Sequence, residues 1–151
     1  MSILKTGSVR GLTGSADSLT LHTSDQSVTF PGAVTHSGTS TFNKPAVGPT
    51  TPIASSGNEV IFDMSQRNNY TLTLNENTTV LQPSSTTIGQ SGSIIITQDG
   101  TGSRTAAWHA DFKWAGGTAP TLTTTASAVD RIDYIVAAAN KIHAVASLDV
   151  K

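Results

Sequence analysis

Four histidines are the side chains of this 151-residue sequence best suited to bind a metal ion or to transfer a proton. None has a partner at the short spacing that metal motifs such as His-Glu-x-x-His require. One of them lies two residues before Asp111, which could supply a ligand pair, but a surface or hydrogen-bonded histidine is the simpler interpretation. We therefore predict no metal site and no cofactor. The four are His22, His36, His109 and His143.

Carboxylates are the next candidates, because two of them can flank a glycosidic bond and hydrolyse it. Here they are dispersed, and the sequence has no Gly-x-Ser-x-Gly motif and no identifiable base. We therefore predict no catalytic residues and no enzymatic activity, although the sequence leaves a glycosidase pair open as the alternative. The carboxylates considered are Glu59, Asp111, Asp130 and Asp133.

An acidic, glycine-rich stretch at residues 99–102 could suggest a calcium loop or a dinucleotide-binding loop. An EF-hand loop needs oxygen ligands at alternating positions and a terminal glutamate, and a dinucleotide motif needs a following helix. The sequence continues with neither. Asp99-Gly100 is instead typical of a hairpin turn. We predict that it joins a strand at residues 94–98 to a return strand at 104–108.

Three aromatic residues close together, Trp108, Phe112 and Trp114, could form a platform on which a sugar stacks. Only 5% of the residues are aromatic, so few other large side chains can fill a core, and packing is the favoured interpretation. The residues that we expect to anchor the core are Phe62, Tyr70, Ile95, Trp108, Phe112, Trp114 and Tyr134.

The amino-acid composition limits the classes of partner that the chain can bind. Charged residues make up 13% of the chain and the net charge is −1, so we expect no nucleic-acid partner. No apolar run approaches the roughly 20 residues of a membrane span, the N-terminus has no signal-peptide core, and cysteine is absent. Such a low charge is unusual for a free monomer and favours a surface partly covered by neighbouring subunits.

Short stretches of alternating apolar and polar residues, separated by turn residues, predict the elements that position these side chains. Residues 126–139 are rich in alanine, as in a helix, but Ile132, Tyr134 and Val136 alternate as in a strand. We predict an all-β fold, an antiparallel β-sandwich or jelly roll with about eight strands after Ser55. The expected strands are 60–64, 70–74, 78–82, 94–98, 104–108, 121–125, 128–137 and 142–150.

The N-terminal part has sparser apolar residues broken by glycines and cannot bury enough surface alone to offset its ordering entropy. We predict an extended arm with short strands at residues 1–42, a Pro/Gly linker at 43–57 and the β-sandwich at 58–151. The arm would add strands to a neighbour's sheet edge or pack on a partner. Its expected contact residues are Leu4, Val9, Leu12, Leu19, Leu21, Val28 and Phe30.

Three blocks carry a resemblance to a known family. They are GQSGSIIITQDGTGSRT (residues 89–105), FKWAGGTAPTLTTTASAVDRIDYIV (112–136) and KIHAVASLDVK (141–151). In combination they resemble a β-sandwich domain of tailed-bacteriophage virion proteins, found at the C-terminus of tail fibres and in small capsid decoration (cement) proteins. The resemblance covers residues 58–151 and implies a homotrimer without catalytic residues.

The leading hypothesis is a trimeric capsid decoration protein, made in the host cytoplasm and placed on the outer capsid surface. There the arm would contact the major capsid protein and stabilise contacts between capsomers. The alternative is a short tail fibre or receptor-binding protein, whose loops at residues 83–91, 99–103 and 115–120 would bind a host glycan.

Overall fold

The computed structural model describes residues 37–43 and 45–151, without the side chains of Thr78 and Thr79. The chain divides into two units, Met1–Asn43 and Lys44–Lys151. In the first unit, residues 37–43 are exposed and belong to no strand or helix. The expected contacts of the arm lie outside the described residues, so its role stays a prediction: these are Leu4, Val9, Leu12, Leu19, Leu21, Val28 and Phe30.

The second unit is built from strands, which confirms the predicted all-β class. Its described residues form nine strands and one short 3₁₀ turn, η1. Residues 129–138 are a strand rather than a helix, as the alternation in that stretch predicts. The elements are β1 (Thr50–Ile53), β2 (Glu59–Asp63), β3 (Asn69–Leu74), β4 (Thr78–Ser84), β5 (Ser91–Gln98), β6 (Ala106–Trp108), β7 (Phe112–Trp114), η1 (Ala115–Gly117), β8 (Val129–Ala138) and β9 (Lys141–Ser147).

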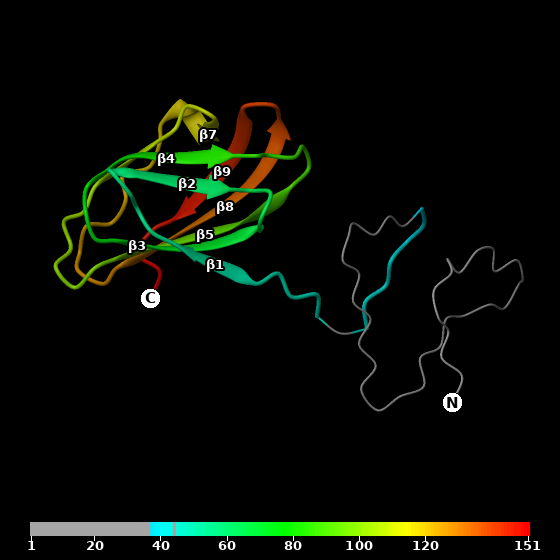
Figure 1. Cartoon of the computed structure of the whole chain (residues 1–151), viewed down its shortest axis with the longest axis horizontal. Helices are drawn as coiled ribbons and strands as arrows, with labels where there is room; N and C mark the ends of the chain where they lie inside the picture. The colour runs from blue at the N-terminus through cyan, green and yellow to red at the C-terminus, as the bar shows by residue number, and fades with distance from the viewer. Residues whose placement is uncertain (1–36, 44) are drawn as a thin grey trace, which may run out of the picture. The chain divides into compact units, whose positions relative to one another are not determined.

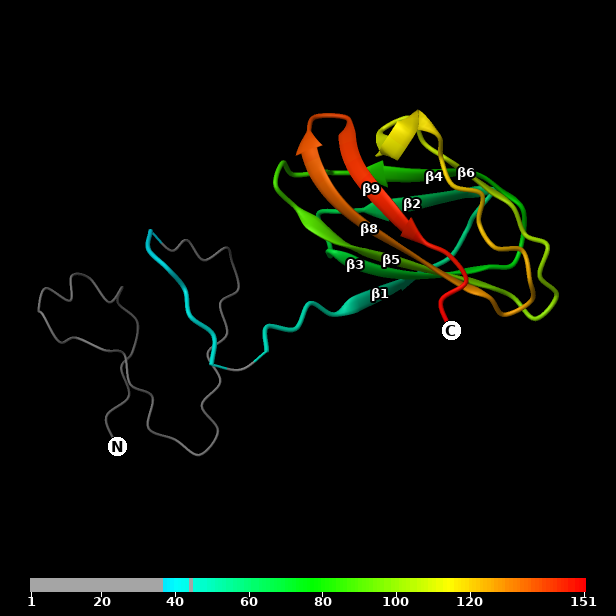
Figure 2. The same cartoon turned by 180° about the vertical axis from the view of Figure 1, so that it is seen from behind.

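The strands form two sheets, which Figures 1 and 2 show, and their inward side chains share one core. The larger sheet has the order β1-β3-β5-β8-β9-β7, and the smaller one has the order β2-β4-β6. From β1 to β6 the chain alternates between the two sheets. Each strand therefore returns parallel to the previous strand of its own sheet.

The pairing corrects one part of the fold prediction. Antiparallel pairing, which the sequence analysis expects throughout, is found only where β8 pairs with β5 and with β9. The other five pairs of neighbouring strands are parallel. Alternation along a strand shows which side chains face inward but not which strand lies beside it. A chain that visits the opposite sheet between two strands re-enters the first sheet in the same direction.

The predicted hairpin over the turn at residues 99–102 is also absent from the structure. β6 pairs with β4 in the smaller sheet instead of returning beside β5. The buried side chain of Gln98 takes the place of hairpin backbone pairing, because its Nε2 donates to the Arg104 carbonyl and its Oε1 accepts from the Arg104 N–H, both at 3.0 Å. The chain then crosses to the other sheet.

Two further strands differ from the prediction. Residues 121–125 form no strand, and their backbone is held by loop contacts, such as the Thr123 N–H that donates to Asp130 Oδ2 at 2.7 Å. β1 lies within the stretch expected to be a linker. β1 is an edge strand, where a proline such as Pro52 is tolerated because one side of the strand has no partner.

The core lies between the sheets. The expected anchors Trp108 and Trp114 are partly buried and pack against it, whereas Ile95 does not belong to it. Ile94 and Ile96 are buried, whereas Ile95 faces outward, opposite Thr71 and Arg131 of the neighbouring strands. Consecutive side chains of a strand point to opposite faces, so the middle one of three isoleucines cannot share a face with the other two. The core residues are Val60, Phe62, Met64, Tyr70, Leu72, Leu74, Leu81, Ile94, Ile96, Phe112, Leu122, Ile132, Tyr134, Val136, Ile142 and Ala144.

Two buried tyrosines fix the loop between β2 and β3 to the large sheet. The Tyr70 hydroxyl lies 2.6 Å from the Asp63 carbonyl and 2.9 Å from that of Arg67. The Tyr134 hydroxyl donates to the Asn68 carbonyl at 2.9 Å. Tyr70 also packs edge-to-face on Phe62, with ring centroids 5.5 Å apart, so the loop is tied to the centre of the core.

This arrangement predicts an alkaline loss of stability. Burial, and secondarily the nearby Tyr70, raise the pKa of Tyr134 from 10.0 to about 12. Because folding favours the neutral phenol, its contribution to stability is complete below pH 10 and is lost as the pH rises toward 12. Replacing Tyr134 by Phe should lower stability by about 1 kcal/mol at neutral pH. It should also make the urea midpoint less sensitive to pH across this range, and an unchanged sensitivity would contradict the assignment.

Candidate functional site

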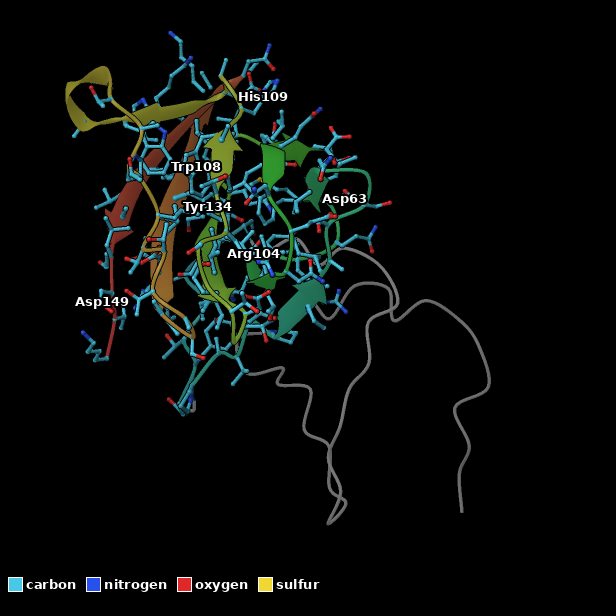
Figure 3. All side chains as sticks on the ribbon, turned by 90° about the vertical axis from the view of Figure 1, so that its left-hand side faces the viewer. Asp63, Arg104, Trp108, His109, Tyr134 and Asp149 are labelled. Atoms are coloured by element: carbon cyan, nitrogen blue, oxygen red, sulfur yellow. The ribbon has the colours of Figure 1, made fainter. Side chains whose placement is uncertain are left out.

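The corner between β6 and β7 brings together the three aromatic residues that the sequence singles out. The turn at residues 109–111 connects the smaller sheet to the edge of the larger one, and the Phe112 N–H donates to the His109 carbonyl at 3.0 Å. His109 Nδ1 accepts from the Asp111 N–H at 3.3 Å and lies 3.5 Å from the Asp111 carboxylate. Figure 3 shows Trp108 and His109 close together, above Tyr134 and Arg104 in that view.

The aromatic rings form one cluster. Trp108 meets both others edge-to-face, with its ring centroid 5.0 Å from that of Phe112 and 4.9 Å from that of Trp114. Phe112 and Trp114 are stacked, with centroids 6.1 Å apart. Phe112 is buried, while both tryptophans pack against the core and stay partly exposed. The cluster thus contributes to packing and also presents aromatic surface.

Both indole N–H groups of this cluster are buried and have no hydrogen-bond acceptor among the described residues. An unpaired buried donor costs about 1–3 kcal/mol. Packing alone therefore does not explain why tryptophan stands at these two positions.

A hollow of about 300 Å³ opens beside the cluster. Its lining combines the three aromatic rings with two basic side chains, His109 and Lys113, and contains no carboxylate. The Lys113 ammonium donates to the Ala110 carbonyl at 2.5 Å, and Lys113 forms no ion pair with any described residue. We call this hollow the aromatic hollow; its lining residues are Trp108, His109, Ala110, Phe112, Lys113, Trp114, Gly117 and Ala119.

A second hollow, of about 510 Å³, lies on the other side of Lys113 and shares Lys113 and Trp114 with the first. The strand register places Lys113 beside His143, and His143 beside Ile135, in one row across β7, β9 and β8. Val145 and Ile135 are 67% and 47% exposed there. We call this second hollow the outer groove.

One family model matches most of the β unit. Residues 50–138 match the family described as "Putative phage tail fibre C-terminal domain". The chain belongs to this family. The matched tail fibre domain spans β1 to β8 and includes every residue that lines the aromatic hollow. Neither a curated protein nor a solved structure matches the chain.

Membership in the tail fibre family identifies the chain as a phage structural protein and a component of the virion. It supports the resemblance that the sequence blocks carry, including the expected occurrence in tail fibres. Within the described ranges, no helix of the chain is long and apolar enough to cross a membrane.

The structure places the other carboxylates that the sequence singles out at separate positions of the β unit. Asp130 is buried and accepts the N–H groups of Thr123 at 2.7 Å and Asp149 at 2.9 Å, so its carboxylate holds a loop and the chain end. Asp133 accepts from Arg131 and from Ser93 on the outer face. Glu59 lines a different hollow, beside β1 and β2.

The two histidines in the described part of the chain do not belong to a metal site. In the part of the chain that the structure describes, no group of three or more His, Asp or Glu side chains is placed to hold a metal ion. His109 is paired with Asp111, and His143 lies on the outer face of β9. His22 and His36 lie outside the described residues.

The glycine-rich turn is closed by its own side chains rather than arranged for an ion. Asp99 Oδ1 accepts the N–H groups of Thr101 and Gly102 at 3.0 and 2.8 Å, and Oδ2 accepts two bonds from the Arg104 guanidinium at 2.7 and 3.0 Å. Arg104, and then the two N–H groups, hold the pKa of Asp99 below its usual value of 3.8.

An acid-stability prediction follows from this turn. Because the folded-state pKa of Asp99 is lowered, its carboxylate contributes stability above about pH 3.8 and loses that contribution as the pH falls through the lowered pKa. The variant Asp99→Asn should therefore lose less stability than the wild type between about pH 5 and about pH 2.5, measured as the urea midpoint. Equal losses in the two proteins would show that the Asp99–Arg104 pair does not contribute.

Of the three loops that the sequence assigns to glycan binding, only the one at residues 115–120 borders the aromatic hollow or the outer groove, through Ala115, Gly117 and Ala119. The loop at 99–103 is committed to its own turn, and in the loop at 83–91 the Gln90 amide donates to the Met64 carbonyl at 2.6 Å. Sequence reasoning missed Lys113 and the outer groove. The available signal was the pair of large apolar residues, Ile135 and Val145, at the outward positions of alternating strands.

Proposed function

We propose that the chain is a tail component of the virion, a short tail fibre or receptor-binding protein whose β unit faces the host. The observation that supports this most is the family match, which runs from the first strand of the unit to β8 and carries a tail fibre description. The concave, aromatic surface at the β6–β7 corner supports the same proposal, since binding sites are concave and enriched in aromatic side chains.

Capsid decoration is the alternative, and it is the leading hypothesis from the sequence alone. It keeps the chain in the virion but gives it another partner, the major capsid protein. The residues that would make those contacts lie outside the described part of the chain, whereas the family description favours the tail.

We further propose a homotrimer. The support is the low fraction of charged residues, 13%, together with large apolar side chains exposed on both sheets, among them Ile61 on β2 and Val145 on β9. Light scattering of the purified full chain should give three times its 15.6 kDa mass. A mass of one chain at micromolar concentration would contradict the trimer.

Copy number distinguishes tail from capsid. Quantitative mass spectrometry of purified virions should find this chain in a small fraction of the number of major capsid protein copies, because a tail carries few appendages. A copy number that approaches that of the capsid subunits would contradict the tail proposal and favour decoration.

A further inference from the structure

The aromatic hollow combines the surface features that recognise a sugar ring. The partly exposed Trp108 and Trp114 offer flat apolar surface, to which the C–H face of a pyranose can pack. Its volume of about 300 Å³ is at the lower end of the range of small-molecule sites, which suits a single sugar unit better than a larger ligand.

The charge of Lys113 indicates that a ligand of this hollow is anionic. Lys113 and His109 line it, and no carboxylate does. His143 lies beside Lys113 on the neighbouring strand and forms no ion pair or hydrogen bond with a described residue. Of the nearby acidic groups, Asp133, which lines the outer groove, is ion-paired with Arg131, and Asp111 lies 3.5 Å from His109 Nδ1. The lysine ammonium is thus left without an acidic partner at the border of the two hollows.

We propose that the aromatic hollow binds an acidic sugar unit, of the hexuronic or sialic acid class, within a surface polysaccharide. The ring of the sugar packs on the tryptophans, and its carboxylate pairs with Lys113, assisted by His109. Since the outer groove continues from the hollow past Lys113, the next unit of the polysaccharide lies toward His143. This inference rests on the proposed function, because it names what the host-facing unit binds.

Binding of the full chain to acidic and neutral polymers tests the inference. Polygalacturonate and polysialic acid are the acidic probes, dextran is the neutral one, and biolayer interferometry is the readout. We expect binding to at least one acidic polymer and none to dextran. Equal binding to dextran, or binding to none of the three, would overturn the proposal.

Single substitutions locate the site. Lys113→Gln removes the positive charge of an exposed side chain. It should weaken binding of the acidic polymer about tenfold or more, because a charge-assisted hydrogen bond is lost. Lys151→Gln makes the same change in charge at an exposed position outside both hollows and should leave binding unchanged. Equal weakening by both substitutions would show a nonspecific attraction of charges and overturn the site.

The contribution of the aromatic rings to binding is tested with a variant that still folds. Trp108→Phe keeps an aromatic ring in the cluster but reduces its surface, and it should weaken binding severalfold while circular dichroism remains that of the wild type. If the same hollow instead mediates contact between copies, Lys113→Gln will change the mass of the assembly and no polymer will bind, which also overturns the inference. The copy number in the virion is independent of these results, so the glycan inference can fail while the tail proposal stands.

Discussion

Replacing Gly92 by alanine is expected to unfold the β unit or to bring it close to unfolding. An added Cβ at this position of β5 would lie 1.7 Å from the Asn68 carbonyl oxygen and 2.6 Å from its carbon, both backbone atoms. The same carbonyl accepts the Tyr134 hydroxyl, so the loop cannot move away without losing that bond. We expect a loss of more than about 3 kcal/mol, a large part of the stability of an ordinary domain.

Gly100 is the matched control for this prediction. It has no heavy atom within 4 Å of an added Cβ and does not have the positive backbone angle that favours glycine. Gly100→Ala should change the free energy of unfolding by no more than about 0.5 kcal/mol in urea titrations. Similar stabilities of the two variants would show that the loop at residues 64–68 does not approach β5 as closely as the structure has it.

Replacing Ile94 by alanine should cost about 2–5 kcal/mol, because the side chain is fully buried between the sheets and its removal leaves a cavity. Ile95→Ala, one residue further along the same strand, should cost about 1 kcal/mol or less, because that side chain is on the outer face and only partly buried. Urea unfolding measures both. A larger loss of stability for Ile95→Ala than for Ile94→Ala would show that β5 presents the opposite face to the core.

This pair also shows what alternation can and cannot predict. In β3, threonines separate the apolar residues, and the pattern assigns the inward face: Tyr70, Leu72 and Leu74 lie there and are buried. In β5 three isoleucines follow one another, so the pattern is silent about the face. The choice of Ile94 and Ile96 over Ile95 depends on the neighbouring strands.

The sheet topology could not be predicted from these patterns. Four of the five parallel pairs are set by the crossing of the chain between two sheets, and the fifth by the placement of β9 between β8 and β7. Neither leaves a mark on the spacing of apolar residues within a strand. The turn at residues 99–102 illustrates the difficulty. Asp99-Gly100 is a good hairpin signal, yet the buried Gln98 closes the turn on Arg104 by its side chain, and the chain then leaves the sheet.

The candidate site was predictable in part. The spacing of Trp108, Phe112 and Trp114 predicts that they lie together, and they form one cluster. That Trp108 and Trp114 stay partly exposed follows from the positions of β6 and β7 at the edges of the two sheets, which no local pattern records. Lys113 lies between Phe112 and Trp114 in the sequence, but its approach to His143 requires the parallel pairing of β7 with β9.

The central claim is that this chain is a tail component whose β unit faces the host, and locating that unit on intact virions tests it most directly. Gold-labelled antibodies raised against residues 44–151, viewed by electron microscopy, should mark the tail and leave the capsid surface unlabelled. Label distributed over the head, with none on the tail, would contradict the account and return the chain to a role in decorating the capsid.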